Sequence, residues 1–205
     1  RAMTGYKNYF EGHGEFCASA SSKYIASGST VATYVAYQAF DRKHKNANNA
    51  WSGITWNSVS PSYDTSTKLV SSGASLGVYA GEWLKLSLPY GVKIGGYQLA
   101  IRSSWSAYCP DDWVILGSND DKNWVLVSSV TAGGIAPGPA GDAILTKDFV
   151  VETTKHYKYL ALVCRKVAGG VNQVNFAELR YFGTREQGQS VLHDGQLTLT
   201  KNLNV

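Results

Sequence analysis

The side chains best suited to chemistry in this chain are aromatic and polar groups in loops, not acid–base pairs or nucleophiles. The histidines fall in unrelated segments, at His13, His44, His156 and His193. No Ser–His–Asp set, HExxH spacing or phosphate-binding glycine loop accompanies them. The acid pairs at 111–112 and 120–121 occupy strand-like segments, where adjacent side chains point to opposite faces and cannot act as a glycosidase dyad. The sequence therefore predicts a chain that is not an enzyme.

The segment RSSWSAYCPDD (102–112) places a cation beside two aromatic rings, at Arg102, Trp105 and Tyr108. A sugar has hydroxyl groups that need fixed hydrogen-bond partners, and an apolar C–H face that stacks on an aromatic ring. This mixture of side chains therefore predicts a carbohydrate-binding loop, with Arg102 as its leading residue.

Two further segments have a similar composition. WSGITWNSVSPSY (51–63) contributes Trp56 and Tyr63, and VAGGVNQ (167–173) contributes Asn172 as a hydrogen-bonding side chain. Loops carry function, so these residues complete the predicted ligand site.

Structural alternatives stand beside these assignments. Trp56 and Trp105 can fold back onto the core, and Arg102 can instead pair with Asp111 or Asp112. The other tryptophans lie in strand-like segments or at their edges, and we expect them to be structural: Trp51, Trp83, Trp113 and Trp124.

Alternating strands must position these loops. In GEWLKLSLP (81–89) the leucines share one face, and Tyr97, Leu99 and Ile101 do the same further along. No stretch of comparable length keeps apolar residues at helical spacing, and Gly or Pro interrupts the chain too often for long helices. The pattern predicts an all-β sandwich or barrel, with segment 54–79 as a long surface loop.

Length and composition predict one folded domain (1–183) followed by a C-terminal tail (184–205). The 205 residues are 44% hydrophobic and 17% charged, which excludes a disordered chain. No apolar run approaches the ~20 residues of a membrane-spanning helix, so we expect no membrane insertion. The formal net charge is +4, but basic residues are dispersed apart from the run at 42–45. Without a basic stripe or recognised motif, nucleic acid is not an expected partner, whereas acidic glycans remain compatible.

The three cysteines support neither a disulfide framework nor a metal cluster. Their number is odd, and they lack the paired close spacing of zinc sites. Cys164 lies in a strand-like run and is expected to be buried, whereas Cys109 lies in a polar loop and is expected to be exposed.

Taken in order, these segments resemble the discoidin-like family, also called the coagulation factor 5/8 type C domain or carbohydrate-binding module family 32. GSNDDKNW (117–124) and AELRYFG (177–183) carry most of the resemblance. The other matching residues are Ala39, Phe40, Asp41, Trp51, Ser52, Gly81, Glu82, Trp83, Leu84, Asp112, Trp113, Leu116, Tyr157, Tyr159, Leu160 and Leu162. The resemblance implies an antiparallel jelly-roll sandwich of a five-stranded and a three-stranded sheet, with ligands bound by loops at one end. Family members bind sugars, lipid headgroups or proteins.

The resemblance also implies a structural Ca²⁺. Asp41 and Glu178 match the family's two acidic positions, and carbonyl oxygens, including that of Ala177, would complete the oxygen ligands that calcium needs. The alternative is a salt bridge from either carboxylate to a base inserted after Asp41, namely Arg42, Lys43 or Lys45.

The tail predicts a hairpin, because SVLHDGQLTLTKNLNV alternates around Asp194 and Gly195. It resembles strands of fibre and surface proteins from phages and large algal viruses. That resemblance implies a host-attachment module on a virion or another extracellular surface, with a polysaccharide or glycoconjugate as partner and oligomerisation through the tail. The alternatives are an adhesion module that binds lipid headgroups or protein, a structural particle component, and an unstructured tail.

Overall fold

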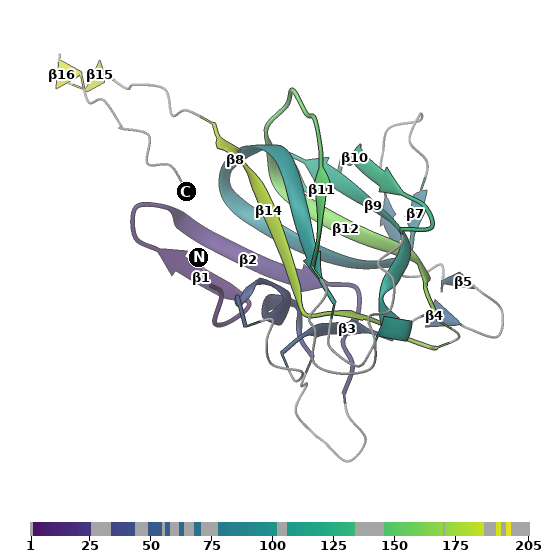
Figure 1. Ribbon diagram of the computed structural model, residues 1–205. Helices are drawn as coiled ribbons and strands as arrows, with labels where there is room; N and C mark the ends of the chain where they lie inside the picture. Colours follow the sequence, from purple (N-terminus) through teal and green to yellow (C-terminus); the bar gives the residue numbers. More distant parts are fainter. Residues whose placement is uncertain are drawn as a thin grey trace.

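Strands make up nearly all the regular structure of this chain in the computed structural model (Figure 1). The structure describes residues 2–25, 34–43, 49–54, 56–57, 62–63, 68–70, 78–101, 106–133, 146–169, 171–186, 192–193 and 196–197. The strands are β1 (Lys7–Phe10), β2 (Gly14–Ala20), β3 (Trp51–Gly53), β4 (Trp56–Asn57), β5 (Ser62–Tyr63), β6 (Lys68–Val70), β7 (Val78–Ala80), β8 (Glu82–Ala100), β9 (Pro110–Ser118), β10 (Val125–Val130), β11 (Thr146–Val150), β12 (Tyr157–Val167), β13 (Val174–Phe176), β14 (Glu178–Arg185), β15 (Leu192–His193) and β16 (Gln196–Leu197). Two 3₁₀ turns join them, η1 (Ala36–Phe40) and η2 (Ser106–Tyr108). The predicted all-β class is confirmed.

The long strand β8 belongs to both layers of the sandwich. Its first half lies between β2 and β12 in the order β1-β2-β8-β12-β9-β10, and its second half lies between β11 and β14. All these pairs are antiparallel, with Leu84 opposite Leu162 in one layer and Tyr97 opposite both Phe149 and Tyr181 in the other. Figure 1 shows β8 curving from one layer to the other. The second layer has the three strands that the resemblance implies, while the β1–β2 hairpin extends the first layer beyond five.

Alternation along the strands builds the core between the layers. Tyr97, Leu99 and Ile101 are buried together, as their period of two predicts. The Trp113 indole N–H donates a 2.9 Å hydrogen bond to the Tyr97 hydroxyl, so this buried polar pair is satisfied within the core. Trp51, Trp113 and Trp124 are at most 2% exposed, and Trp83 packs half-buried, which confirms the structural reading of all four.

Two expectations about loops were wrong. Cys109 is only 1% exposed, because it packs within the hydrophobic core, and the Ala168 N–H donates to its carbonyl at 3.0 Å. Cys164 is buried as predicted, and none of the three cysteines, all of which are described, forms a disulfide. The segment expected to be one long loop instead contains two short antiparallel pairs, β4 with β5 and β6 with β7.

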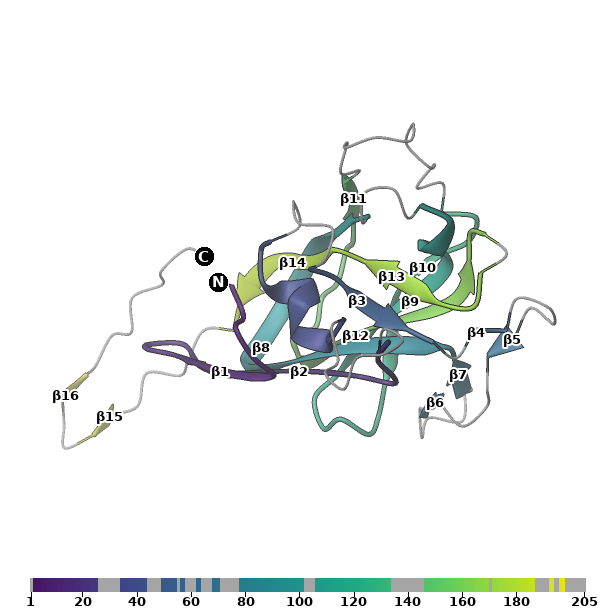
Figure 2. The ribbon, with the colours of Figure 1, turned by 90° about the horizontal axis from the view of Figure 1, so that it is seen from below.

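The predicted C-terminal hairpin is confirmed by the pairing of β15 with β16, in which Leu192 lies opposite Leu197. Figure 2 shows this pair set apart from the two layers. The preceding strand β14 continues to Arg185, and the Glu186 N–H donates to the Gly91 carbonyl at 2.8 Å. Within the described part of the chain, no helix has the length and apolar character needed to cross a membrane.

Candidate functional site

The GSNDDKNW segment forms the turn between β9 and β10 and stabilises the frame. The Asp120 carboxylate accepts hydrogen bonds from the backbone N–H groups of Lys122 and Asn123, at 2.9 and 2.7 Å. These bonds hold the pKa of Asp120 well below its usual range, because they favour the ionised form. Gly117 lies against the Tyr157 ring, where a Cβ atom would come within 2.5 Å of it. The motif that contributes most to the resemblance is thus structural.

Two of the predicted ligand loops are in direct contact at one end of the sandwich. The Gly169 N–H donates to the Ala107 carbonyl at 2.8 Å, joining the loop after β12 to η2. A Cβ atom at position 169 would lie 2.7 Å from the Ala107 Cβ, so the glycine allows the close approach. The described parts of the 167–173 and 102–112 segments therefore meet at this contact.

The third predicted loop begins beside the same segment. Strand β3 pairs with β13, with Val174 opposite Gly53, and the Ser52 hydroxyl donates to the Gln173 side chain and the Val174 carbonyl, both at 3.1 Å. A shallow hollow of about 400 Å³ lies at this junction. It is lined by Lys23, Tyr24, Ile25, Ile54, Asn172 and Gln173.

The structure places the predicted ligand residues as follows. Asn172 is exposed on this hollow, and Tyr108 is half-buried in η2. Trp56 lies opposite Tyr63 in the β4–β5 pair, although only the backbone of these two residues is described. The positions of Arg102 and Trp105 lie outside the described residues.

The neighbouring acids in β9 have basic partners on β12. Asp112 accepts from the Arg165 guanidinium at 2.5 Å, and Asp111 accepts from Lys166 at 2.8 Å. Hydrogen bonding to Asp111 raises the pKa of Lys166. Both acids that the sequence offers as partners for Arg102 are therefore paired with other cations.

Asp41 and Glu178, the two predicted metal ligands, lie together. Asp41 directly follows η1, Glu178 begins β14, and they are 5% and 2% exposed. Burial raises the pKa of Glu178 to about 7, and the nearby negative charge of Asp41 adds to the increase. Ala177 is fully buried, and its N–H donates to the Ala100 carbonyl at 2.8 Å, leaving its own carbonyl as a candidate ligand.

No family model matches this sequence, and no curated protein sequence matches it. Solved structures do match its coordinates. An F5/8 type C domain from Bacteroides fragilis has a TM-score of 0.54 at 15% identity, covering 83% of this chain and 93% of that one. The discoidin-like fold is therefore shown.

Two further structures with this fold contain bound glycans. A CBM32 module from Clostridium perfringens, solved with GalNAc-β-1,3-galactose, has a TM-score of 0.53 at 17% identity and covers 82% of this chain and 95% of its own. The lectin domain of lectinolysin, complexed with Lewis b antigen, has a TM-score of 0.52 at 13% identity and covers 82% and 92%. At these identities the likeness shows the fold alone.

The acidic pair of this discoidin-like fold matches part of the ligand set for a cation. Among the described residues, Glu178 Oε2 is buried without a hydrogen-bond partner, so it has a free acceptor position. Asp41 accepts the Lys43 backbone N–H at 2.8 Å and the Asn49 amide at 3.2 Å. No third His, Cys, Asp or Glu joins the pair within the described ranges, so backbone carbonyls would have to supply the remaining ligands.

The salt-bridge alternative takes a different form from the one that the sequence suggests. The cation that pairs with Glu178 among the described residues is Arg180, whose Nε lies 3.7 Å from Glu178 Oε1; of the inserted bases, Lys45 lies outside the described residues. Arg42 contributes its backbone N–H to the Glu178 carboxylate, and this contact lowers the pKa of that carboxyl. The sequence does contain a signal for this pairing: Glu178 and Arg180 are two residues apart in strand β14, which places their side chains on the same face.

Proposed function

We propose that this chain is a non-catalytic carbohydrate-binding module that binds a polysaccharide or glycoconjugate through loops at one end of its discoidin-like fold. The observation that carries the proposal is the convergence of the polar, aromatic loops. The Gly169–Ala107 hydrogen bond and the β3–β13 pairing, which join the described ends of these loops, support it. A rigid frame that presents such loops suits sugar recognition, because fixed donors and rings bind without a large ordering cost.

Each proposed ligand residue has a distinct role. Arg102 donates hydrogen bonds to sugar hydroxyls, while Trp105 and Tyr108 provide rings for the apolar sugar face. Trp56 and Tyr63 provide further rings for the ligand. Asn172 adds a hydrogen bond from the hollow beside β13.

Glycan complexes of structures with the same fold support this function, since GalNAc-β-1,3-galactose and Lewis b antigen are the molecules bound there. The finer proposal is attachment to a cell-surface or cell-wall glycan, outside the cell or on a virion, with the C-terminal tail joining copies into an oligomer. The β15–β16 hairpin is compatible with this role, because a two-stranded pair gains stability by packing on further strands.

A structural Ca²⁺ is part of the proposal. Asp41, Glu178 and the Ala177 carbonyl would hold it between η1 and β14. Bound there, the cation would neutralise two buried carboxylates and fix η1 onto the second sheet.

The test is a glycan array probed with the wild-type chain and two double variants. Arg102→Ala/Trp105→Ala removes a cation and a ring from the proposed site. Lys7→Ala/Tyr9→Ala is the matched control, because these residues are 73% (side chain) and 74% exposed on β1. We expect the wild type and the control to bind the same glycans and the site variant to lose them.

Equal binding by all three proteins would place the site elsewhere, and no binding across plant, algal, bacterial and animal glycans would overturn the function. A parallel array with a chelator tests calcium separately. Loss of binding or of thermal stability there would support the metal ligands.

One observation favours a second candidate, binding to a lipid headgroup. Ile25 and Ile54 are 46% and 47% exposed and line the same hollow as Lys23. Apolar side chains beside a base suit an anionic membrane surface. Vesicles of phosphatidylserine would bind the wild type and not an Ile25→Ser/Ile54→Ser variant; equal binding to neutral vesicles would argue against this candidate.

A further inference from the structure

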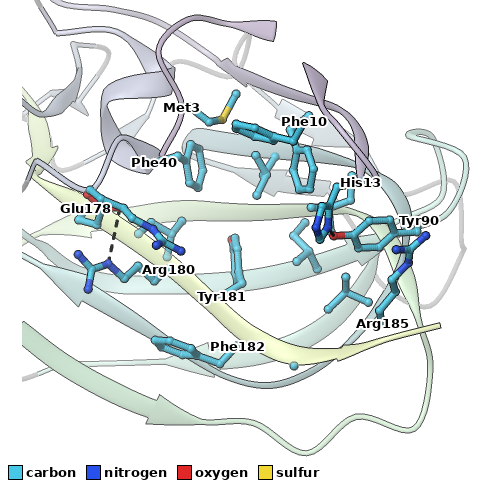
Figure 3. Close-up of a pocket in the computed structure, with 18 residues that line it drawn as sticks. Met3, Phe10, His13, Phe40, Tyr90, Glu178, Arg180, Tyr181, Phe182 and Arg185 are labelled. Carbon is cyan, nitrogen blue, oxygen red and sulfur yellow. Dashed lines mark hydrogen bonds and ion pairs between the residues drawn. The ribbon is translucent and has the colours of Figure 1, made fainter. Parts of the chain in front are cut away.

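A second cavity, remote from the ligand loops, lies between the β1–β2 hairpin and strand β14. Its volume is about 390 Å³, within the range of small-molecule pockets. None of its lining residues comes from the loops at 51–63, 102–112 or 167–173. More than half of its lining residues are apolar, among them Met3, Phe10 and Phe40 (Figure 3). Phe16, Leu86 and Leu88 also line it.

A buried hydroxyl points into this apolar space. Figure 3 shows the Tyr181 side chain directed from β14 into the cavity. Its oxygen is buried and has no hydrogen-bond partner in the described part of the chain. Burial raises the pKa of Tyr181, so the phenol stays neutral and keeps its proton to donate. A buried donor without an acceptor is costly, and the cost falls when a ligand supplies the acceptor.

The charged side chains at the cavity are mostly basic. Arg42 and Arg185 are exposed, and Arg180 is half-buried. Arg185 stacks on the Tyr90 ring at 4.0 Å, where His13 Nδ1 lies 3.5 Å from the Tyr90 hydroxyl. Glu178 is the one acid among the lining residues, and Arg180 lies 3.7 Å from it. The lining therefore favours an anionic head over a cationic one.

We propose that this cavity binds a small amphipathic carboxylate of the medium-chain fatty acid class. Its carboxylate accepts the hydrogen bond of Tyr181 in the field of the arginines, and its chain packs against the phenylalanines and leucines. A cavity of about 390 Å³ lies at the lower end of the ~300–1,000 Å³ of small-molecule pockets, which suits a medium chain better than a long one. The site shares no residue with the sugar loops, and its test does not depend on glycan binding.

Sodium decanoate is the probe, titrated by calorimetry below its micelle-forming concentration, with 1-decanol as the neutral probe of equal chain length. We expect saturable one-to-one binding of decanoate and about tenfold weaker binding of decanol. Tyr181→Phe removes only the hydroxyl and is expected to weaken decanoate about tenfold, the effect of one hydrogen bond to a charged head. Tyr9→Phe, on the exposed strand β1, is the matched control and is expected to bind as the wild type.

A cavity-filling pair separates binding in the cavity from adsorption to the surface. Leu88→Phe adds volume inside the cavity and is expected to abolish binding, whereas Val150→Phe adds the same kind of ring at an 87% exposed position and is expected to leave it unchanged. Circular dichroism and thermal unfolding establish that each variant is folded. Non-saturable uptake that is equal in all variants, equal affinity for decanol, or unchanged binding by Tyr181→Phe would each overturn the proposal. No heat and no thermal shift with decanoate would do so as well.

Discussion

Replacing Glu178 by Gln tests the physics of the buried acidic pair, because the substitution keeps the shape of the side chain and removes its charge. In the metal-free protein, burial and Asp41 raise the pKa of Glu178 from its ordinary value of 4.5 to about 7. The folded state therefore holds a proton at Glu178 over a pH range in which the unfolded state has lost it. The stability contributed by the protonated group is fully present below pH 4.5, declines as the pH rises to about 7, and stays low above it.

The size of this effect follows from the two pKa values. The interval from 4.5 to about 7, at 1.36 kcal/mol per pH unit, corresponds to a loss of about 3 kcal/mol in the free energy of unfolding. Glutamine has no such titration. With chelator present, Glu178→Gln should therefore gain stability relative to the wild type between pH 4 and pH 8, by up to about 3 kcal/mol. With calcium at pH 8, we expect the order to reverse, since the charged carboxylate binds the ion more tightly than the neutral amide oxygen of glutamine.

Urea unfolding followed by tryptophan fluorescence measures both effects, with profiles from pH 4 to 8 in chelator and a second series in calcium. Glu15→Gln, which removes an exposed carboxyl on β2, controls for the loss of one negative charge. The reasoning would be refuted if the difference in free energy of unfolding between the wild type and Glu178→Gln stayed constant across the pH range. It would also be refuted if, in chelator, the wild type became the more stable of the two as the pH rises. Calcium that stabilises both proteins equally would refute the metal ligand.

Three further outcomes follow from the frame and the thiols. Gly117→Ala should destabilise the fold by about 1–3 kcal/mol, measured by urea unfolding, because its Cβ would meet the Tyr157 ring at 2.5 Å; an unchanged midpoint would contradict this. Asp120→Ala should lower the thermal midpoint at neutral pH, because the lowered pKa of Asp120 means that its ionised carboxylate stabilises the fold. The difference in midpoint from the wild type should decrease as the pH falls below 3.8 and the carboxylate is protonated. A thiol reagent at pH 8 should label Cys17 in the folded chain and spare Cys109, which is 1% exposed and whose pKa is raised to about 11; equal labelling before and after unfolding would argue against that burial.

The sequence was sufficient to predict the class of fold, because alternation is a local signal. Tyr97, Leu99 and Ile101 are buried as their spacing predicts. The β1–β2 hairpin was missed because its role depends on a distant partner: Ala18 lies opposite Leu86 in β8, and nothing in the local pattern of 7–20 specifies that register. The burial of Cys109 was not predictable from its polar segment for the same reason, since it depends on distant core residues and on the neighbouring Ala168 segment.

In the candidate site, too, residue types could be read from the sequence, whereas contacts between distant segments could not. The residue types in 102–112 and 167–173 identified two loops as ligand segments, and their contact through Ala107 and Gly169 could not be read from either alone. At the acidic pair, residue type identified Asp41 and Glu178. The electrostatics around them depend on Arg180 and on a backbone N–H of the turn after η1, and such long-range geometry is encoded only in the packed fold.

The acidic pair also connects the two sites proposed for β14. Glu178 is both a candidate calcium ligand and part of the cavity wall, and Tyr181 lies on the same strand. A calcium ion would cancel the negative charge that opposes a carboxylate in the cavity, and a bound carboxylate would in turn favour the cation. Linkage makes the two effects equal, so calcium and decanoate would raise each other's affinity by the same factor. The sugar loops share no lining residue with this cavity, and their affinity would change only through the positions of β8 and β14.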